Sequence, residues 1–172
     1  MEYLEALEAK EKQVGTPQTG SGSFLLDYWN DTANDEVNHV IVRTEIGLIL
    51  LNRYPYAGGH LLVALGHPAP TLLDYAPDQR AALWRLVEEA TALMQFAIEP
   101  QGINIGINQG RAAGAGVPQH LHVHLVPRWN GDINFMAAVG HVRVIPNSLE
   151  AMAQRYRHAQ KELADASTNP KP

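Results

Sequence analysis

Three histidines alternate with apolar residues in the segment HLHVHLV, at positions 120, 122 and 124. Alternate side chains of a β-strand share a face, so the spacing predicts that His120, His122 and His124 point the same way and the apolar residues point into a core. Core packing alone does not explain three imidazoles, because each buried imidazole needs polar partners. The pattern therefore indicates a strand whose outer face carries chemistry.

A metal site is one explanation of the histidines, because imidazole is a common zinc ligand. A strand rises about 3.3 Å per residue, so His120 and His124 start about 13 Å apart, whereas a zinc–nitrogen bond is about 2.0–2.1 Å long. One ion could take two neighbouring histidines, and a third ligand would come from elsewhere, such as His60 or His67. A surface histidine run is a weaker alternative, because the alternation with Leu and Val is strict.

An extended anion such as a polyphosphate is the third explanation. One neutral imidazole can attack phosphorus, while its neighbours donate hydrogen bonds to phosphate oxygens. The loop at 109–119 comes directly before the histidines, and its small residues Gly114 and Gly116 would let backbone N–H groups approach a phosphate. Arg128, after the strand, is a candidate to hold a terminal phosphate or to pair with Asp132.

Composition limits the classes of function. The 172 residues fit one domain, and the absence of cysteine excludes disulfides and thiolate metal sites. The net charge of -5 argues against a nucleic-acid polymer as partner. We expect no secretory signal and no membrane span, and therefore a cytoplasmic protein. Residues 101–146 are net basic, which leaves both a small anionic ligand and a buried sheet with few charges open.

The elements that must position the histidines follow from hydrophobic periodicity and turn residues. The sequence predicts an antiparallel sheet with one long helix and a C-terminal helix, an α+β fold. Strands are expected within 39–52 (two, with a turn near 45–47), at 60–65, at 102–108 and at 120–129. Helices are expected at 2–13, at 77–98 with Pro77 in its first turn, and at 147–166 with Asn147 or Ser148 as N-cap.

On these residues the chain resembles the histidine triad (HIT) superfamily of nucleotide hydrolases and transferases. HLHVHLV (120–126) matches the family motif His-φ-His-φ-His-φ-φ, in which φ is apolar, at every position. LNRYPYAGGHLLVAL (51–65) and INQG (107–110) extend the resemblance, which covers roughly 37–146. The segments VPRWNGDINFM (126–136) and YPYAGGHLLV (54–63) are most similar to the diadenosine tetraphosphate phosphorylase branch.

The resemblance implies a HIT-like fold, a homodimer, and a role for each motif residue. His122 is expected to attack the α-phosphorus of an adenine nucleotide and form a nucleotidyl-histidine, while His120 and His124 flank the phosphates. Water, phosphate or another acceptor then takes the nucleotidyl group. The expected substrate-binding residues surround the nucleotide: Asn52 at the ribose, His60 near the nucleophile, Asn108 near the α-phosphate, and Gly114, Gly116, Gln119 and Arg128 along the phosphates.

The sequence departs from the family pattern at three positions. Gly116 and Val117 stand where many members carry Gln or Ser, so Gln119 or Arg111 would have to replace that contact to phosphate. Ala57 stands where the phosphorylase branch often has Asn. A phosphoramidate hydrolase, a nucleotide-binding protein without turnover and a metalloenzyme therefore stay open as alternatives.

The chain is expected to divide into an N-terminal helical extension and linker (1–23), a HIT domain (24–166) and a tail (167–172). No permanently bound cofactor is expected, and a magnesium complex of the substrate is left open. Trp129 is expected to pack in the core rather than to stack on a base. Surface or structural roles are expected for four other histidines, His39, His67, His141 and His158.

Overall fold

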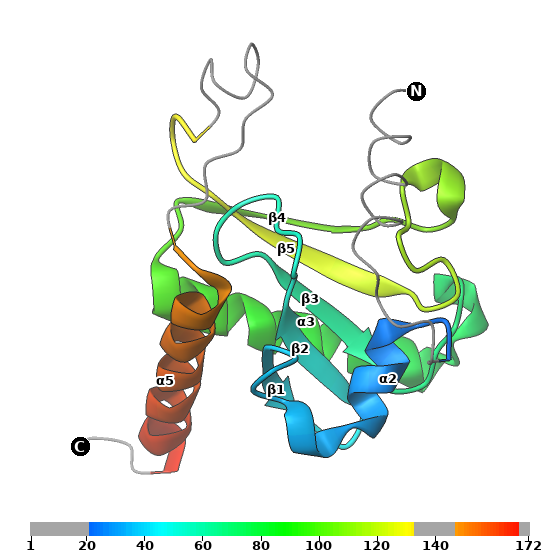
Figure 1. Cartoon of the computed structure of the whole chain (residues 1–172), viewed down its shortest axis with the longest axis horizontal. Coiled ribbons are helices and arrows are strands. Elements are labelled where there is room, and N and C mark those ends of the chain that lie inside the picture. Colours follow the sequence, from blue (N-terminus) through cyan, green and yellow to red (C-terminus); the bar gives the residue numbers. More distant parts are fainter. Residues whose placement is uncertain (1–20, 133–146, 169–172) are drawn as a thin grey trace.

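The computed structural model describes residues 21–132 and 147–168. The helix predicted at 2–13, most of the linker, His141 and the last four residues lie outside these ranges. The described chain has the predicted α+β fold (Figure 1). Its strands are β1 (Val40–Arg43), β2 (Gly47–Leu51), β3 (Leu61–Leu65), β4 (Gly102–Ile107) and β5 (His122–Arg128), and its helices are α2 (Phe24–Asn30), α3 (Pro77–Ile98) and α5 (Leu149–Thr168).

The five strands form one antiparallel sheet in the order β1-β2-β3-β5-β4. Strand β5, which carries the histidine motif, lies between β3 and β4 and pairs with both along most of its length. His122 lies opposite Ala64, and His124 lies opposite Leu62 on one side and Gly106 on the other. Two of the three histidines therefore stand on a strand that is hydrogen-bonded on both sides.

Helix α3 covers one face of the sheet and has the predicted bounds. Pro77 begins it, and Glu99 ends it in a left-handed conformation with φ of 45°. Its buried stripe, which includes Leu83, Leu86 and Met94, joins the alternate residues of β5 in the main core. Trp129 packs at the edge of this core, as predicted. The apolar side of the HLHVHLV alternation therefore points into a core, as the sequence indicated.

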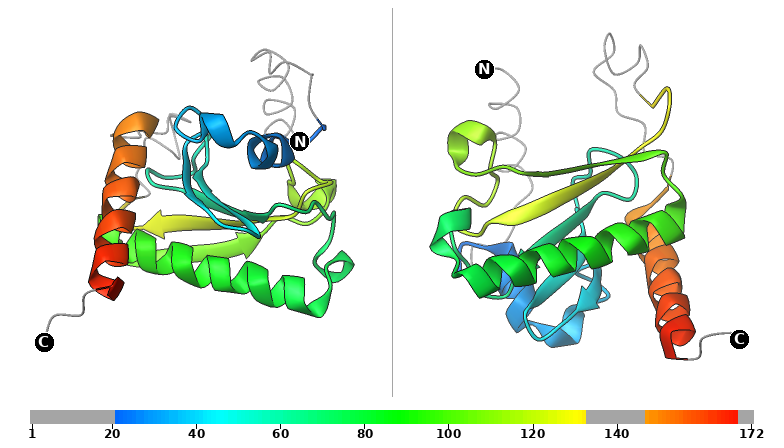
Figure 2. Two further views of the ribbon diagram at one scale, coloured as in Figure 1. Left: turned by 90° about the horizontal axis from the view of Figure 1, so that it is seen from below. Right: turned by 180° about the vertical axis from the view of Figure 1, so that it is seen from behind.

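The opposite face of the sheet is also covered, by the short helix α2 (Figure 2). A second apolar cluster lies there, formed by Leu25 of α2 and by residues of three strands: Val40, Leu48, Leu50, Leu62 and Ala64. Helix α2 was not predicted from the sequence, and the histidine face was expected to be the outer face of the sheet. That expectation was wrong for His120 and His122, which are buried on this covered face.

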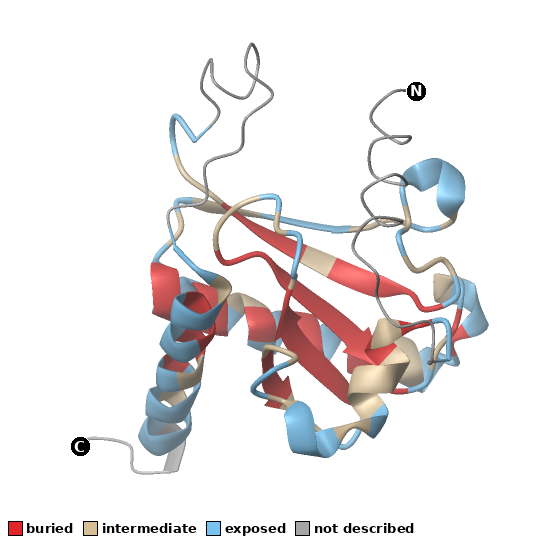
Figure 3. Ribbon diagram, viewed as in Figure 1, coloured by how far each residue is buried: buried red, intermediate tan, exposed pale blue. Residues whose placement is uncertain are grey.

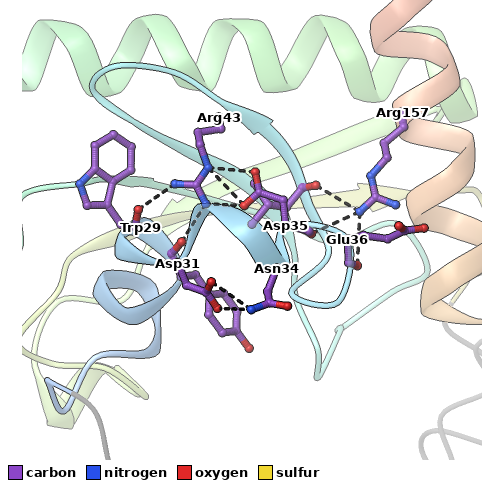
Figure 4. Close-up of polar contacts among 9 residues, drawn as sticks. Trp29, Asp31, Asn34, Asp35, Glu36, Arg43 and Arg157 are labelled. Atoms are coloured by element: carbon purple, nitrogen blue, oxygen red, sulfur yellow. Dashed lines mark hydrogen bonds and ion pairs between the residues drawn. The ribbon is translucent and has the colours of Figure 1, made fainter.

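Polar contacts hold α2 against the sheet at its C-terminal end (Figure 4). The Arg43 guanidinium on β1 donates to the carbonyl oxygens of Tyr28 and Trp29, each at 2.8 Å, and forms an ion pair with Asp35. These carbonyls end the helix and have no partner within it. Arg157 of α5 donates to the carbonyls of Asp35 and Glu36, each at 3.4 Å, and to that of Val40 at 3.2 Å. The segment before β1 is thus tied to both the sheet and the last helix.

Helix α5 packs against α3 and β1 and reaches the turn before β3. Ser148 caps it, since its hydroxyl accepts a hydrogen bond from the Ala151 amide at 3.1 Å, as predicted. The buried Tyr156 hydroxyl donates to the Gly59 carbonyl at 2.8 Å. Figure 3 shows buried residues along the central strands and exposed residues along the outer side of α5. No helix within the described ranges is long and apolar enough to cross a membrane.

Candidate active site

His120, directly before β5, has both ring nitrogens engaged by other parts of the protein. Its Nε2 lies 2.7 Å from the Leu65 carbonyl oxygen, and its Nδ1 lies 2.8 Å from Oγ of Ser23. A carbonyl only accepts, so Nε2 carries the proton and Nδ1 accepts from the Ser23 hydroxyl. The His120 ring is 0% exposed, and burial lowers its pKa. This side chain is a neutral imidazole held between two fixed partners.

His122 is oriented by the backbone of His120. Its Nδ1 lies 2.9 Å from the His120 carbonyl oxygen and must therefore donate the proton. The lone pair is then on Nε2, which hydrogen-bonds to no other described residue. His122 is 6% exposed, and burial lowers its pKa, so the ring stays neutral at physiological pH. A neutral imidazole with one nitrogen anchored and the other carrying a lone pair has the form of a nucleophile.

His124 receives a hydrogen bond from His60, which directly precedes β3. The His60 Nδ1 accepts from the Tyr56 amide at 3.1 Å, so the proton of His60 is on Nε2. That Nε2 lies 3.0 Å from Nδ1 of His124 and donates to it. The remaining proton of His124 is then on its own Nε2. The chain of contacts from Tyr56 to His124 fixes the tautomers of two imidazoles and makes His124 a hydrogen-bond donor.

Burial keeps the His124 imidazole neutral, and aromatic rings pack against it. Desolvation lowers the pKa of His124 to about 4, with His122 as a smaller cause. The Tyr56 ring lies over both imidazoles, with centroids 4.9 Å from His60 and 5.9 Å from His124. The centroids of His122 and His124 are 4.9 Å apart. Four rings thus form one cluster on the histidine face of the sheet.

The loop before β5 supplies backbone groups close to the motif. Gly110 and Gly114 adopt φ of 83° and 84°, a conformation that favours glycine. The Asn108 amide nitrogen lies 4.0 Å from where a Cβ on Gly114 would be, so this loop folds back on the end of β4. Gly116 is exposed, and its amide donates to no other described residue. Gln119 donates its amide to the Gly22 carbonyl.

Two other predicted residues have partners within the protein. The Asn52 amide contacts His60 Nδ1 at 3.3 Å, which brings the expected ribose residue to the histidine cluster. Arg128 forms an ion pair with Asp132 at 2.7 Å, one of the two roles that the sequence left open. His39 and His158 contact glutamates on α5, and His67 is exposed.

Sequence reasoning missed three residues that position the site: Ser23, Tyr56 and Tyr156. Ser23 and His120 are 97 positions apart, as are Tyr156 and Gly59, and no local pattern links such pairs. Within 21–132 and 147–168, no three His, Asp or Glu side chains gather as a metal ion would require. The described histidines are arranged instead around one another and around backbone carbonyls.

The family model described as HIT domain matches residues 34–131, more than half of the chain. A protein of Mycobacterium tuberculosis named AP-4-A phosphorylase is 38% identical over 116 residues, which are 67% of this chain and 60% of that relative. A protein of Schizosaccharomyces pombe named bis(5'-nucleosyl)-tetraphosphatase [asymmetrical] is 32% identical over 97 residues, which are 56% of this chain and 53% of that relative. This chain therefore spans about three fifths or less of these relatives' lengths.

The solved structures include a zinc-bound histidine triad family protein from Mycobacterium smegmatis. It has a TM-score of 0.69 and 29% identity, and the match covers 86% of this chain and 99% of that protein. The similarity to a phosphorylase of the superfamily agrees with the prediction made from the residues after the motif. By its matched model, its relatives and its fold, this chain belongs to the HIT family.

Proposed function

We propose that this protein cleaves a nucleotide phosphoanhydride at the α-phosphorus, through a covalent nucleotidyl-His122 intermediate, with a dinucleoside polyphosphate as substrate. The observation that carries the proposal is the tautomer of His122, whose Nδ1 is protonated and anchored while Nε2 bears the lone pair. The names of the two curated relatives, a phosphorylase of AP-4-A and a tetraphosphatase, support this substrate class.

In the first step, Nε2 of His122 forms a bond to the α-phosphorus and the bond from phosphorus to the bridging oxygen breaks. The leaving polyphosphate takes the electron pair of that bond. The imidazole becomes cationic, and its Nδ1–H stays hydrogen-bonded to the His120 carbonyl, 2.9 Å away. A backbone carbonyl that already faces the ring stabilises this charge without rearrangement.

His124 donates from Nε2 to a phosphate oxygen during this step. The Tyr56 amide fixes the tautomer of His60, and His60 donates to Nδ1 of His124. The proton of His124 is therefore already on Nε2 before the substrate binds. The exposed backbone of the 109–119 loop binds the α-phosphate beside Asn108, and its amides replace the side chain that Gly116 and Val117 lack. Both ring nitrogens of His120 are engaged by the protein, so His120 contributes through its own carbonyl, which orients the His122 ring.

In the second step, an acceptor oxygen attacks phosphorus on the opposite side, the phosphorus–nitrogen bond breaks, and neutral His122 is restored. The similarity to the phosphorylase favours inorganic phosphate as the acceptor. The substrate enters as its magnesium complex, since a polyphosphate binds this ion in solution. We also propose a homodimer joined through β4, an edge strand on which Ile105 is 43% exposed.

Product analysis tests the proposal. Diadenosine tetraphosphate is incubated with the protein, with and without inorganic phosphate, and the nucleotides are separated. ADP and ATP formed only with phosphate identify a phosphorylase, whereas AMP and ATP formed without phosphate identify a hydrolase with the same first step. No products in either mixture would contradict the proposal and favour a phosphoramidate substrate or binding without turnover.

A further inference from the structure

The residues before the matched region contact the histidine motif directly. The HIT model begins at residue 34, yet Ser23 lies against His120, with its hydroxyl 2.8 Å from Nδ1. Ser23 is 1% exposed, so this polar side chain is buried and aimed at the imidazole. If the Ser23 hydroxyl moved away from this nitrogen, a buried donor would lose its acceptor, which costs free energy.

Helix α2 fixes the position of that hydroxyl. Ser23 is its N-cap, and its Oγ accepts from the Leu26 amide at 3.3 Å, so the hydroxyl proton is directed to His120. Arg43 holds the other end of the helix through the Tyr28 and Trp29 carbonyls (Figure 4). The helix is therefore anchored at both ends, and Ser23 cannot move without breaking one of these anchors.

Helix α2 also packs tightly beside the second partner of His120. A Cβ added to Gly66 would lie 2.1 Å from the Trp29 ring, so only glycine permits this approach. Gly66 directly follows Leu65, whose carbonyl accepts from Nε2 of His120 at 2.7 Å. Helix α2 thus packs against the end of β3, where the Leu65 carbonyl binds one ring nitrogen of His120. The same helix is capped by Ser23, whose hydroxyl binds the other ring nitrogen.

We propose that Ser23 is a positioning residue for the nucleotidyl transfer step, because it locks the His120 ring and thereby the carbonyl that orients Nε2 of His122. The inference rests on the proposed function. The sequence of contacts is Ser23 Oγ to His120 Nδ1, then the His120 carbonyl to His122 Nδ1. Ser23 does not touch the reacting atoms, and its effect is on the angle of attack, where a displacement of about 1 Å costs up to about 100-fold in rate.

Three variants separate this role from a merely structural one. Ser23→Gly removes the hydroxyl but keeps an acceptable N-cap, since glycine costs only a few tenths of a kcal/mol there. Ser23→Thr keeps both the hydroxyl and the cap. Leu25→Val is the matched control, because it weakens the buried face of α2 without removing a polar group.

The measurements are kcat and KM of the full chain for diadenosine tetraphosphate, the thermal unfolding midpoint, and the NMR signal of the His120 ring N–H. Ser23→Gly is expected to lower kcat by about 10- to 100-fold with KM changed less than about threefold. Ser23→Thr restores kcat, and Leu25→Val lowers the unfolding midpoint while keeping kcat. The His120 N–H signal is expected to be sharp in wild type and Ser23→Thr, and broadened or lost in Ser23→Gly.

Wild-type kcat in Ser23→Gly would overturn the inference and leave the proposed function standing, as would an equal loss of kcat in Leu25→Val. A wild-type protein inactive on every nucleotide tested would contradict the proposed function instead. In that case the NMR signal alone tests whether Ser23 fixes the His120 ring. An unchanged His120 N–H signal in Ser23→Gly would show that the hydroxyl does not lock the ring.

Discussion

His120 and His124 stand two residues to either side of His122, but the protein holds them differently. Both ring nitrogens of His120 are bound, by Ser23 and by the Leu65 carbonyl. His124 has one nitrogen bound by His60, and its Nε2–H has no partner among the described residues. The same spacing in the sequence thus gives one imidazole that is held on both sides and one that retains a donor.

The difference comes from elements outside the motif. Helix α2 and the end of β3 enclose His120, whereas the turn before β3 and the Tyr56 ring border His124. Alternation along a strand decides which face a side chain takes, and neighbours from other elements decide what its nitrogens can do. A row of like residues can therefore contain one nucleophile, one donor and one structural support.

The largest effect is expected at His122, the reference point for the comparison. His122→Ala removes the proposed nucleophile and should lower kcat by about 10³-fold or more, with the fold retained. Steady-state kinetics with diadenosine tetraphosphate and a circular dichroism spectrum measure both. Full activity of the variant would remove the basis for assigning any role to its neighbours.

Substitution of the two outer histidines tests the comparison itself. His124→Leu removes the proposed donor to the phosphate and should lower kcat by about 10²- to 10³-fold, and it leaves one buried group, the His60 Nε2–H, without its acceptor. His120→Leu removes the acceptor of the Ser23 hydroxyl and the Nε2–H donor to the Leu65 carbonyl, two buried groups, and should cost more unfolding free energy, about 1–3 kcal/mol for each group. Urea denaturation and kinetics on both proteins measure the contrast. Equal effects in the two variants would show that the outer histidines are equivalent.

The pH dependence of stability sharpens the description of His124. Its pKa is about 4 in the folded protein and near 6.5 when unfolded, so the unfolded chain binds more protons between these values. The contribution of His124 to the free energy of unfolding should not change with pH above 6.5. It should decrease as the pH drops from 6.5 towards 4. His124→Leu should show a shallower fall in urea denaturation at pH 7.5, 6 and 5. An identical pH profile would mean that His124 titrates normally.

The smallest effect is expected at Arg128, four residues beyond His124 on the same face. Arg128 already forms an ion pair with Asp132, at 2.7 Å, so its charge would be divided between that carboxylate and a terminal phosphate. Arg128→Gln should raise KM for diadenosine tetraphosphate by no more than about fivefold, since charge pairs exposed to solvent contribute little. The triphosphate analogue should show less change. A lower kcat with constant KM would place Arg128 at the reacting phosphorus instead.

Much of the fold could be predicted because its elements are long or strictly periodic. Helix α3 spans the predicted 77–98, and each strand lies within its predicted segment. Helix α2 was missed because seven residues after a Gly/Ser segment carry too short a pattern to be recognised as a helix. The burial of His120 was missed for the same reason, because α2 is the element that covers it.

The candidate site was predictable where one segment contains the information. HLHVHLV indicates the face, and the resemblance to the HIT family indicates the order of roles. The tautomers could not be predicted, because they depend on the Leu65 and His120 carbonyls and on the Tyr56 amide. Backbone groups carry no sequence signal, and their positions follow only from the register of β3 and β5.

Trapping the covalent intermediate tests the central claim most directly. The protein is mixed with diadenosine tetraphosphate without an added acceptor, quenched, digested, and the modified peptide is sequenced by mass spectrometry. The account predicts an adenylyl group on His122, absent from His122→Ala and still formed, more slowly, in His124→Leu. An adenylyl group on His124 or His60, or turnover with none on any histidine, would contradict it.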